Sequence, residues 1–168
     1  APLLVERRSR DEVFAATRAV SGTDVDFGEV TRQLIDRLAA ALREFWYGRG
    51  HLAEGRAWLA QVLAVDDIAD AARGYALLSA GQLAHNQGDH APAHAALAAA
   101  LAIFADLTDP RGRAAVLNEL AWLHFDGHSP AAAVDYFEES IALVRSLADP
   151  AWLAVLLSST AMVLGYQD

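Results

Sequence analysis

Histidine is the residue type in this sequence that first invites a chemical interpretation. His90 and His94 are four residues apart, and so are His124 and His128. On a helix this spacing places two imidazoles on one face, as a pair of zinc ligands requires. The sequence has no cysteine, no His-Glu-x-x-His motif and no trio of carboxylates near these pairs. We therefore expect these histidines to serve turns and surface packing, and we expect no metal and no cofactor.

Paired carboxylates and hydroxyl residues are the next candidates for chemistry. Asp66-Asp67 and Glu138-Glu139 are adjacent pairs, and neighbouring residues on a helix point in different directions. Helix capping and a solvated surface are therefore their expected roles. No phosphate-binding glycine loop and no Gly-x-Ser-x-Gly motif occurs. The run Ser158-Ser159-Thr160 has no base nearby in the sequence, so we expect no enzymatic activity.

Composition limits the partners and the compartment. The 168 residues carry a formal net charge of −9 and no cysteine. An acidic chain is poorly suited to grip a phosphate backbone, and the absence of cysteine fits a reducing cytoplasm. No stretch approaches the roughly 20 consecutive apolar residues of a membrane span. We expect a cytoplasmic protein with no direct nucleic-acid contact and no membrane contact.

The elements that position these residues are all predicted to be helices. Apolar residues recur at intervals of three and four, and Asp-Pro and Gly-Asp pairs separate the segments. Asp109-Pro110 and Asp149-Pro150 each supply an N-cap followed by proline in the first turn. The predicted helices span about 8–20, 24–47, 52–63, 67–86, 91–105, 110–125, 130–147 and 150–165.

A stretch of sequence occurs twice, 40 residues apart. Ala93–Pro110 and Ala133–Pro150 align, with Leu107 on Leu147 and Asp109 on Asp149. A fixed period in this range indicates stacked supersecondary units. We expect a leading helix and connection in residues 1–28, followed by three and a half helix pairs at about 29–64, 67–106, 110–147 and 150–168. Since Met162 is the sole methionine and the last pair is incomplete, we expect a piece of a longer protein.

Small residues recur where the two helices of each pair would cross. They are Gly55, Gly81, Ala93, Ala121 and Ala133, and a larger side chain would push the helix axes apart. This pattern resembles the tetratricopeptide repeat (TPR), which implies an all-α fold, an α-α superhelix. The 40-residue period suits HEAT-type repeats by length, whereas the Gly-Asp turn and the small residues favour TPR. Trp46 and Trp58 are expected to pack between helices.

The run from Phe45-Trp46-Tyr47 through Gly50-His51-Leu52 to Leu59 resembles a narrower group. It looks like the TPR region of large bacterial LuxR-type and AfsR-type transcription regulators, which carry an ATPase module. This resemblance implies a bacterial signal-transduction fragment that binds a protein or ligand. The alternative is a free-standing TPR scaffold or adaptor that binds a peptide.

The TPR resemblance also implies a concave groove lined by the first helix of each pair. A peptide or a small polar ligand would bind there and shift the curvature of the array, and a homodimer is possible. For Trp122 and Phe125, packing in the core is the competing interpretation. The groove residues implied by the resemblance are Arg37, Glu44, Tyr47, Tyr75, Gln82, His85, Asn86, Asn118, Glu119, Trp122, Phe125, Asp126 and Tyr166.

Overall fold

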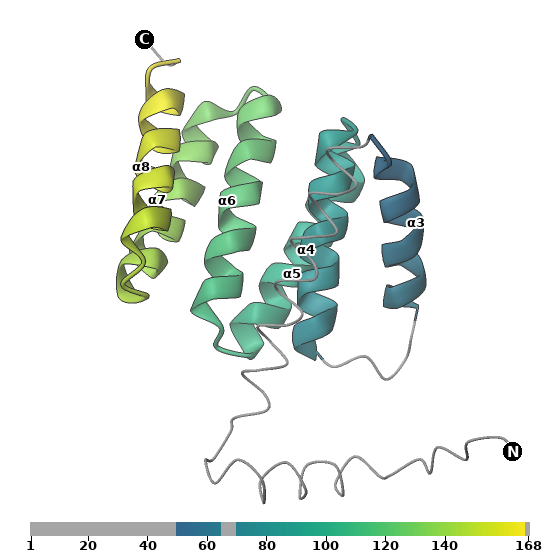
Figure 1. Ribbon diagram of the computed structural model, residues 1–168. Coiled ribbons are helices and arrows are strands. Elements are labelled where there is room, and N and C mark those ends of the chain that lie inside the picture. The colour runs from purple at the N-terminus through teal and green to yellow at the C-terminus, as the bar shows by residue number, and fades with distance from the viewer. Residues whose placement is uncertain (1–49, 65–69, 167–168) are drawn as a thin grey trace, which may run out of the picture. The chain divides into compact units, whose positions relative to one another are not determined.

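The computed structural model describes residues 50–64 and 70–166, and within these ranges every regular element is an α-helix. The all-α prediction is therefore confirmed for this part of the chain. The predicted helices before residue 50 lie outside the described residues. The helices are α3 (Leu52–Leu63), α4 (Asp70–Asn86), α5 (His90–Asp106), α6 (Pro110–Asp126), α7 (Pro130–Ser146) and α8 (Pro150–Leu164). Figure 1 shows them side by side, with α3 and α8 at opposite edges of the row.

The predicted helix starts at the two Asp-Pro pairs are confirmed in detail. The Asp109 carboxylate accepts hydrogen bonds from the backbone N–H groups of Arg111 and Gly112, at 3.0 and 3.1 Å. The Asp149 carboxylate accepts one from the N–H of Trp152 at 3.1 Å. These are N–H groups that a helix start leaves without a partner. The hydrogen bond from the Trp152 N–H lowers the pKa of Asp149. The Arg111 guanidinium lowers this pKa further, and partial desolvation opposes both effects.

A left-handed residue recurs every 20 residues, once in each turn after α4, α5, α6 and α7. These residues are Gly88, Thr108, His128 and Ala148, with φ of 77°, 51°, 62° and 51°. After three of these helices, the residue that follows donates its N–H to a carbonyl five residues back, which closes the helix end. Each connection is thus a three-residue turn, and the helices that precede these turns all have 17 residues. The 40-residue sequence period is twice this backbone period.

The core runs along the row as three clusters of buried side chains. Leu59 of α3 packs with Leu83 of α4, Phe104 of α5 with Val116 of α6, and Phe137 of α7 with Leu156 of α8. The five small residues predicted at the helix crossings are all buried. At Gly81 a Cβ atom would lie 2.7 Å from Leu97 Cγ. The prediction that α4 and α5 need a small residue there is therefore confirmed.

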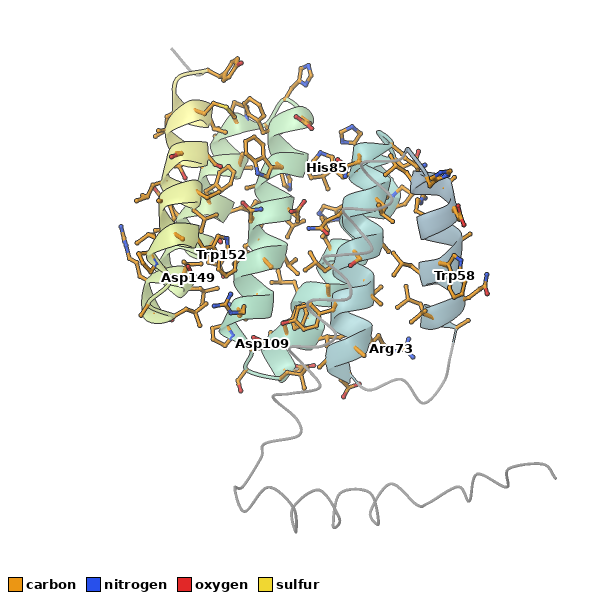
Figure 2. The ribbon with its side chains drawn as sticks, viewed as in Figure 1. Trp58, Arg73, His85, Asp109, Asp149 and Trp152 are labelled. Atoms are coloured by element: carbon orange, nitrogen blue, oxygen red, sulfur yellow. The ribbon has the colours of Figure 1, made fainter. Side chains whose placement is uncertain are left out.

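The prediction for Trp58 is wrong. Its side chain is 57% exposed and extends outward from α3 into solvent (Figure 2). Leu59, one residue later, is the α3 side chain that enters the core. The ring was expected to pack between helices, but the helix phase set by Gly55 and Leu59 turns residue 58 away from the core. Trp46 lies outside the described residues.

Candidate functional site

Polar side chains join α4 to α6 in a row along the length of both helices. The Tyr75 hydroxyl donates to Asp109 Oδ2 at 3.2 Å, and Gln82 Nε2 donates to Glu119 Oε1 at 2.9 Å. His85 Nε2 lies 2.8 Å from Asp126 Oδ2. We call these three pairs the α4–α6 polar row. Figure 2 places His85 at the end of the helices opposite Asp109, so the row extends from one end to the other.

The polar row consists largely of residues predicted to line a groove. The structure brings together five of them: Tyr75, Gln82 and His85 on α4 with Glu119 and Asp126 on α6. Asn118 Nδ2 also donates to Glu119 Oε1, at 3.4 Å. These groups hydrogen-bond to one another across the two helices. A ligand bound there would have to replace these contacts or extend them.

The remaining predicted residues are not gathered in this row. Trp122 packs edge-on against Phe137 of α7, with ring centroids 5.4 Å apart, and Phe125 packs against Tyr166, at 5.3 Å. Trp122 and Phe125 border the cluster shared by α6, α7 and α8. This agrees with the alternative interpretation of these two residues, in which they pack in the core. Asn86 is exposed at the end of α4. Arg37, Glu44 and Tyr47 lie outside the described residues, and groove binding and a homodimer remain predictions.

A histidine-rich depression lies at the end of the row that carries His85. Its volume is about 520 Å³, and it is open to solvent. It is lined by His90, Ala91, His94, Leu123, His124, Asp126, Gly127, His128 and Ser129. The two histidine pairs seen separately in the sequence thus share one site. They meet because α5 begins at the same end at which α6 terminates.

Contacts within the depression fix two of its imidazoles. His124 stacks on Tyr136, with centroids 5.0 Å apart, and meets His94 edge-on at 6.1 Å. His128 Nδ1 lies 2.9 Å from the carbonyl oxygen of Asp126. His124 Nε2 is buried without a hydrogen-bond partner in the part of the chain that the structure describes. The depression thus brings imidazole groups and the Asp126 carboxylate to one open surface.

Metal binding finds no support in this arrangement. Within residues 50–64 and 70–166, no three histidine, aspartate or glutamate side chains gather so that they could hold a metal ion. None of the helices in these same ranges has the length and apolar character needed to cross a membrane.

Comparison with known proteins points to an enzyme family. Residues 1–47 match the malate:quinone oxidoreductase (Mqo) family. A probable malate:quinone oxidoreductase of Paenarthrobacter aurescens is 47% identical over 62 residues, which is 34% of this chain and 12% of that protein. The corresponding protein of Chromohalobacter salexigens is 63% identical over 38 residues, 23% of this chain and 8% of that protein. No solved structure matches the chain.

The extent of these matches is limited on both sides. The protein of Leifsonia xyli with the same name is 56% identical over 41 residues, 24% of this chain and 8% of its own length. The chain thus spans about a tenth of the length of the relatives that it matches. The family match ends at residue 47, before the first described helix.

These comparisons overturn the functional expectations from the sequence. The resemblance of residues 45–59 to the TPR region of bacterial transcription regulators is wrong, because the matching family and relatives are malate:quinone oxidoreductases. The signal-transduction and peptide-adaptor interpretations fail with it, and so does the expectation that the chain has no part in an enzyme. Small residues at helix crossings are a requirement of close helix packing in general, so they identify helical hairpins and no particular family.

Proposed function

We propose that this chain is part of a malate:quinone oxidoreductase, an enzyme that oxidises malate and reduces a quinone. The observation that carries this proposal is the family match over residues 1–47. The high identity of short stretches in several bacterial relatives supports it. Since the chain spans a small part of those proteins, the reaction is assigned to the whole enzyme.

The helical part plays a supporting role in this proposal. Its charged and polar side chains pair across neighbouring helices, as in the polar row, in Arg113 with Glu139 at 3.2 Å, and in Arg111 with Asp149 at 3.3 Å. Such pairs connect neighbouring elements of the helical part, which supports a structural contribution to the whole enzyme. We also propose a cytoplasmic location, because a sequence without cysteine suits a reducing compartment.

A segment exchange tests the enzyme assignment. In the full-length Chromohalobacter salexigens relative, the stretch that corresponds to the family match is replaced by residues 1–47 of this chain. Malate-dependent quinone reduction is then measured in the exchanged enzyme. We expect kcat/KM to stay within about tenfold of the parent, because the substituted residues already share most of their identities and about 1.4 kcal/mol of lost transition-state stabilisation gives tenfold.

The control exchanges the same stretch for an equally long piece taken from residues 110–156 of this chain. It should abolish activity, because residues 110–156 lie outside the part of the chain that matches the family. If the exchange with residues 1–47 also abolishes activity while the thermal unfolding of the enzyme is unchanged, the proposal is wrong.

A further inference from the structure

Helix α8 carries an apolar face that no other described residue covers. Leu157 and Leu164 are each 46% exposed, and Ala154 and Ala161 are exposed beside them. These four residues, spaced by three and four, lie on one side of the helix, and we call them the α8 face. No charged residue occurs between Pro150 and Leu164. A helix surface that faces only water normally carries polar or charged side chains.

The side of α8 opposite the α8 face is buried, and so is the equivalent side of α6. The two helices begin 40 residues apart at equivalent Asp-Pro caps. Val116, Leu120 and Leu123 of α6 are buried, and their counterparts 40 residues later, Leu156, Thr160 and Val163 of α8, are buried as well. These side chains face the preceding helices in both cases. The two helices therefore pack against the preceding helices through equivalent residues.

The two helices differ at the α8 face, where residues that are buried on α6 are exposed on α8. Ala114, Leu117 and Ala121 of α6 are at most 1% exposed, and Ala114 and Ala121 cluster with α7. Their counterparts 40 residues later are Ala154, Leu157 and Ala161, which are exposed. The α8 face is thus the surface that, on α6, binds the next helix. The α8 face is therefore equivalent to the α6 side of the α6–α7 interface.

The helices that cover this surface elsewhere share one pattern. On α5 the fully buried residues are Ala93, Leu97, Ala100 and Phe104. On α7 they are Ala133, Phe137, Ser140 and Val144, each 40 residues later. The pattern is small, large, small, large at relative positions 0, 4, 7 and 11. Small residues allow the backbones to approach, and large residues fill the spaces beside them.

We propose that the α8 face binds an amphipathic α-helix with this α5/α7 pattern, packed antiparallel to α8 as α7 packs against α6. The inference does not depend on the enzyme assignment, since it rests on packing within the described helices. A second copy of the chain is the competing occupant. The repeated use of one pattern at two interfaces favours the α5/α7-type helix.

A synthetic peptide of residues 128–148, which contains the α7 sequence, tests the proposal. It carries a fluorescent label and is added to the full 168-residue chain, and fluorescence anisotropy reports binding. We expect saturable binding that weakens at least about tenfold in the chain variants Leu157→Arg and Ala161→Arg, because each places a charge in the apolar contact. Ala151→Arg should leave binding unchanged, because α6 has Arg111 at the equivalent exposed position.

Peptide variants keep the test decisive if a chain variant loses its helical circular dichroism. The peptide with Phe137→Glu and Val144→Glu, added to the unchanged chain, should lose binding. Absence of binding by the original peptide, or binding that these changes leave intact, would overturn the proposal. It would also be overturned by a dimer in sedimentation that Leu157→Arg abolishes and the peptide does not disrupt, because the occupant would then be a second copy.

Discussion

The ring of Phe104 on α5 lies directly against the backbone of Gly112 on α6. A Cβ atom built on Gly112 would lie 2.5 Å from Phe104 Cδ1, closer than side-chain atoms approach one another. The same ring borders Gly74 of α4, where a Cβ would lie 2.9 Å from it. Phe104 is fully buried, so its ring is surrounded by other atoms of the protein. Two glycines on neighbouring helices therefore make the space for one aromatic ring.

Substituting Gly112 by alanine should destabilise the folded chain. We expect the free energy of unfolding to fall by about 1–3 kcal/mol, because overpacking forces the ring or the helix to shift. Urea denaturation followed by circular dichroism measures the change. Adding Phe104→Leu should recover part of it. Gly165→Ala is the control, since its Cβ would meet nothing closer than 3.5 Å; an equal loss in that variant would contradict the explanation.

Thr108 adopts a conformation that glycine would adopt with less strain. Its φ is 51°, and a left-handed conformation costs a residue with a Cβ about 1–2 kcal/mol. Thr108→Gly should therefore stabilise the chain by up to about 1 kcal/mol, after the greater freedom of glycine in the unfolded chain is subtracted. The midpoint of thermal unfolding should rise.

The reverse substitution at the equivalent turn provides a matched test. Gly88 has φ of 77° and open space around the position of a Cβ. Gly88→Ala should lower the free energy of unfolding by about 1 kcal/mol through backbone strain. If both substitutions shift stability in the same direction, the strain assigned to these turns is wrong.

The Gln82–Glu119 pair in the polar row should show measurable coupling. A double-mutant cycle with Gln82→Ala and Glu119→Ala should give a coupling free energy of about 0.5–1.5 kcal/mol, because the pair is partly buried and the carboxylate accepts a hydrogen bond. Chemical denaturation of the four proteins measures it. Zero coupling would mean that the row does not hold α4 against α6.

Asp149 should make stability depend on pH in the acidic range. Its pKa in the folded chain is lowered, first by the hydrogen bond from the Trp152 N–H and also by Arg111. A carboxylate with a lowered folded pKa stabilises the fold at pH values above its unfolded pKa of about 3.9. That stabilisation is lost as the pH falls toward the lower, folded value.

Comparing the chain with Asp149→Ala tests this dependence. The stability difference between the two should be constant from pH 5 to 7 and should shrink below about pH 4. Asp149→Asn, which keeps a capping acceptor, should retain part of the stability at pH 7 and show less acid dependence. Thermal unfolding at each pH gives the measurement. A difference that stays constant down to pH 2 would contradict the assignment.

Sequence reasoning was most accurate where local chemistry fixes an element. Asp109-Pro110 and Asp149-Pro150 set the starts of α6 and α8 at the predicted residues, because a cap and a fixed proline φ act within a few residues. Gly81 and Ala93 were placed correctly at a crossing because the 40-residue repeat marks such positions twice. The shared histidine depression was missed, since it depends on which helix ends lie together.

Two failures have different physical origins. The Phe104 contact with Gly112 is not repeated 40 residues later, where Val144 and Trp152 occupy the equivalent positions, so no periodicity indicated it. The enzyme relationship lies in residues 1–47, where the sequence was interpreted as a leading helix and connection followed by the first helix of a predicted pair. That relationship is carried by the identities of individual residues, and hydrophobic spacing does not report them.

Adjacent 17-residue helices also differ in the extent of the contacts between them. Contacts between α4 and α5, and between α6 and α7, are more extensive than those between α5 and α6. The contacts of α3 with α4 and of α7 with α8 are as sparse as those of α5 with α6, and among the described helices only the α5–α6 seam is also bridged by contacts between α4 and α6. Under mild denaturant, the two end helices should therefore separate first, while the amides of α4 to α7 stay protected from hydrogen exchange. The slowest amides to exchange would then lie where Phe104 and the α4–α6 polar row connect the two central hairpins.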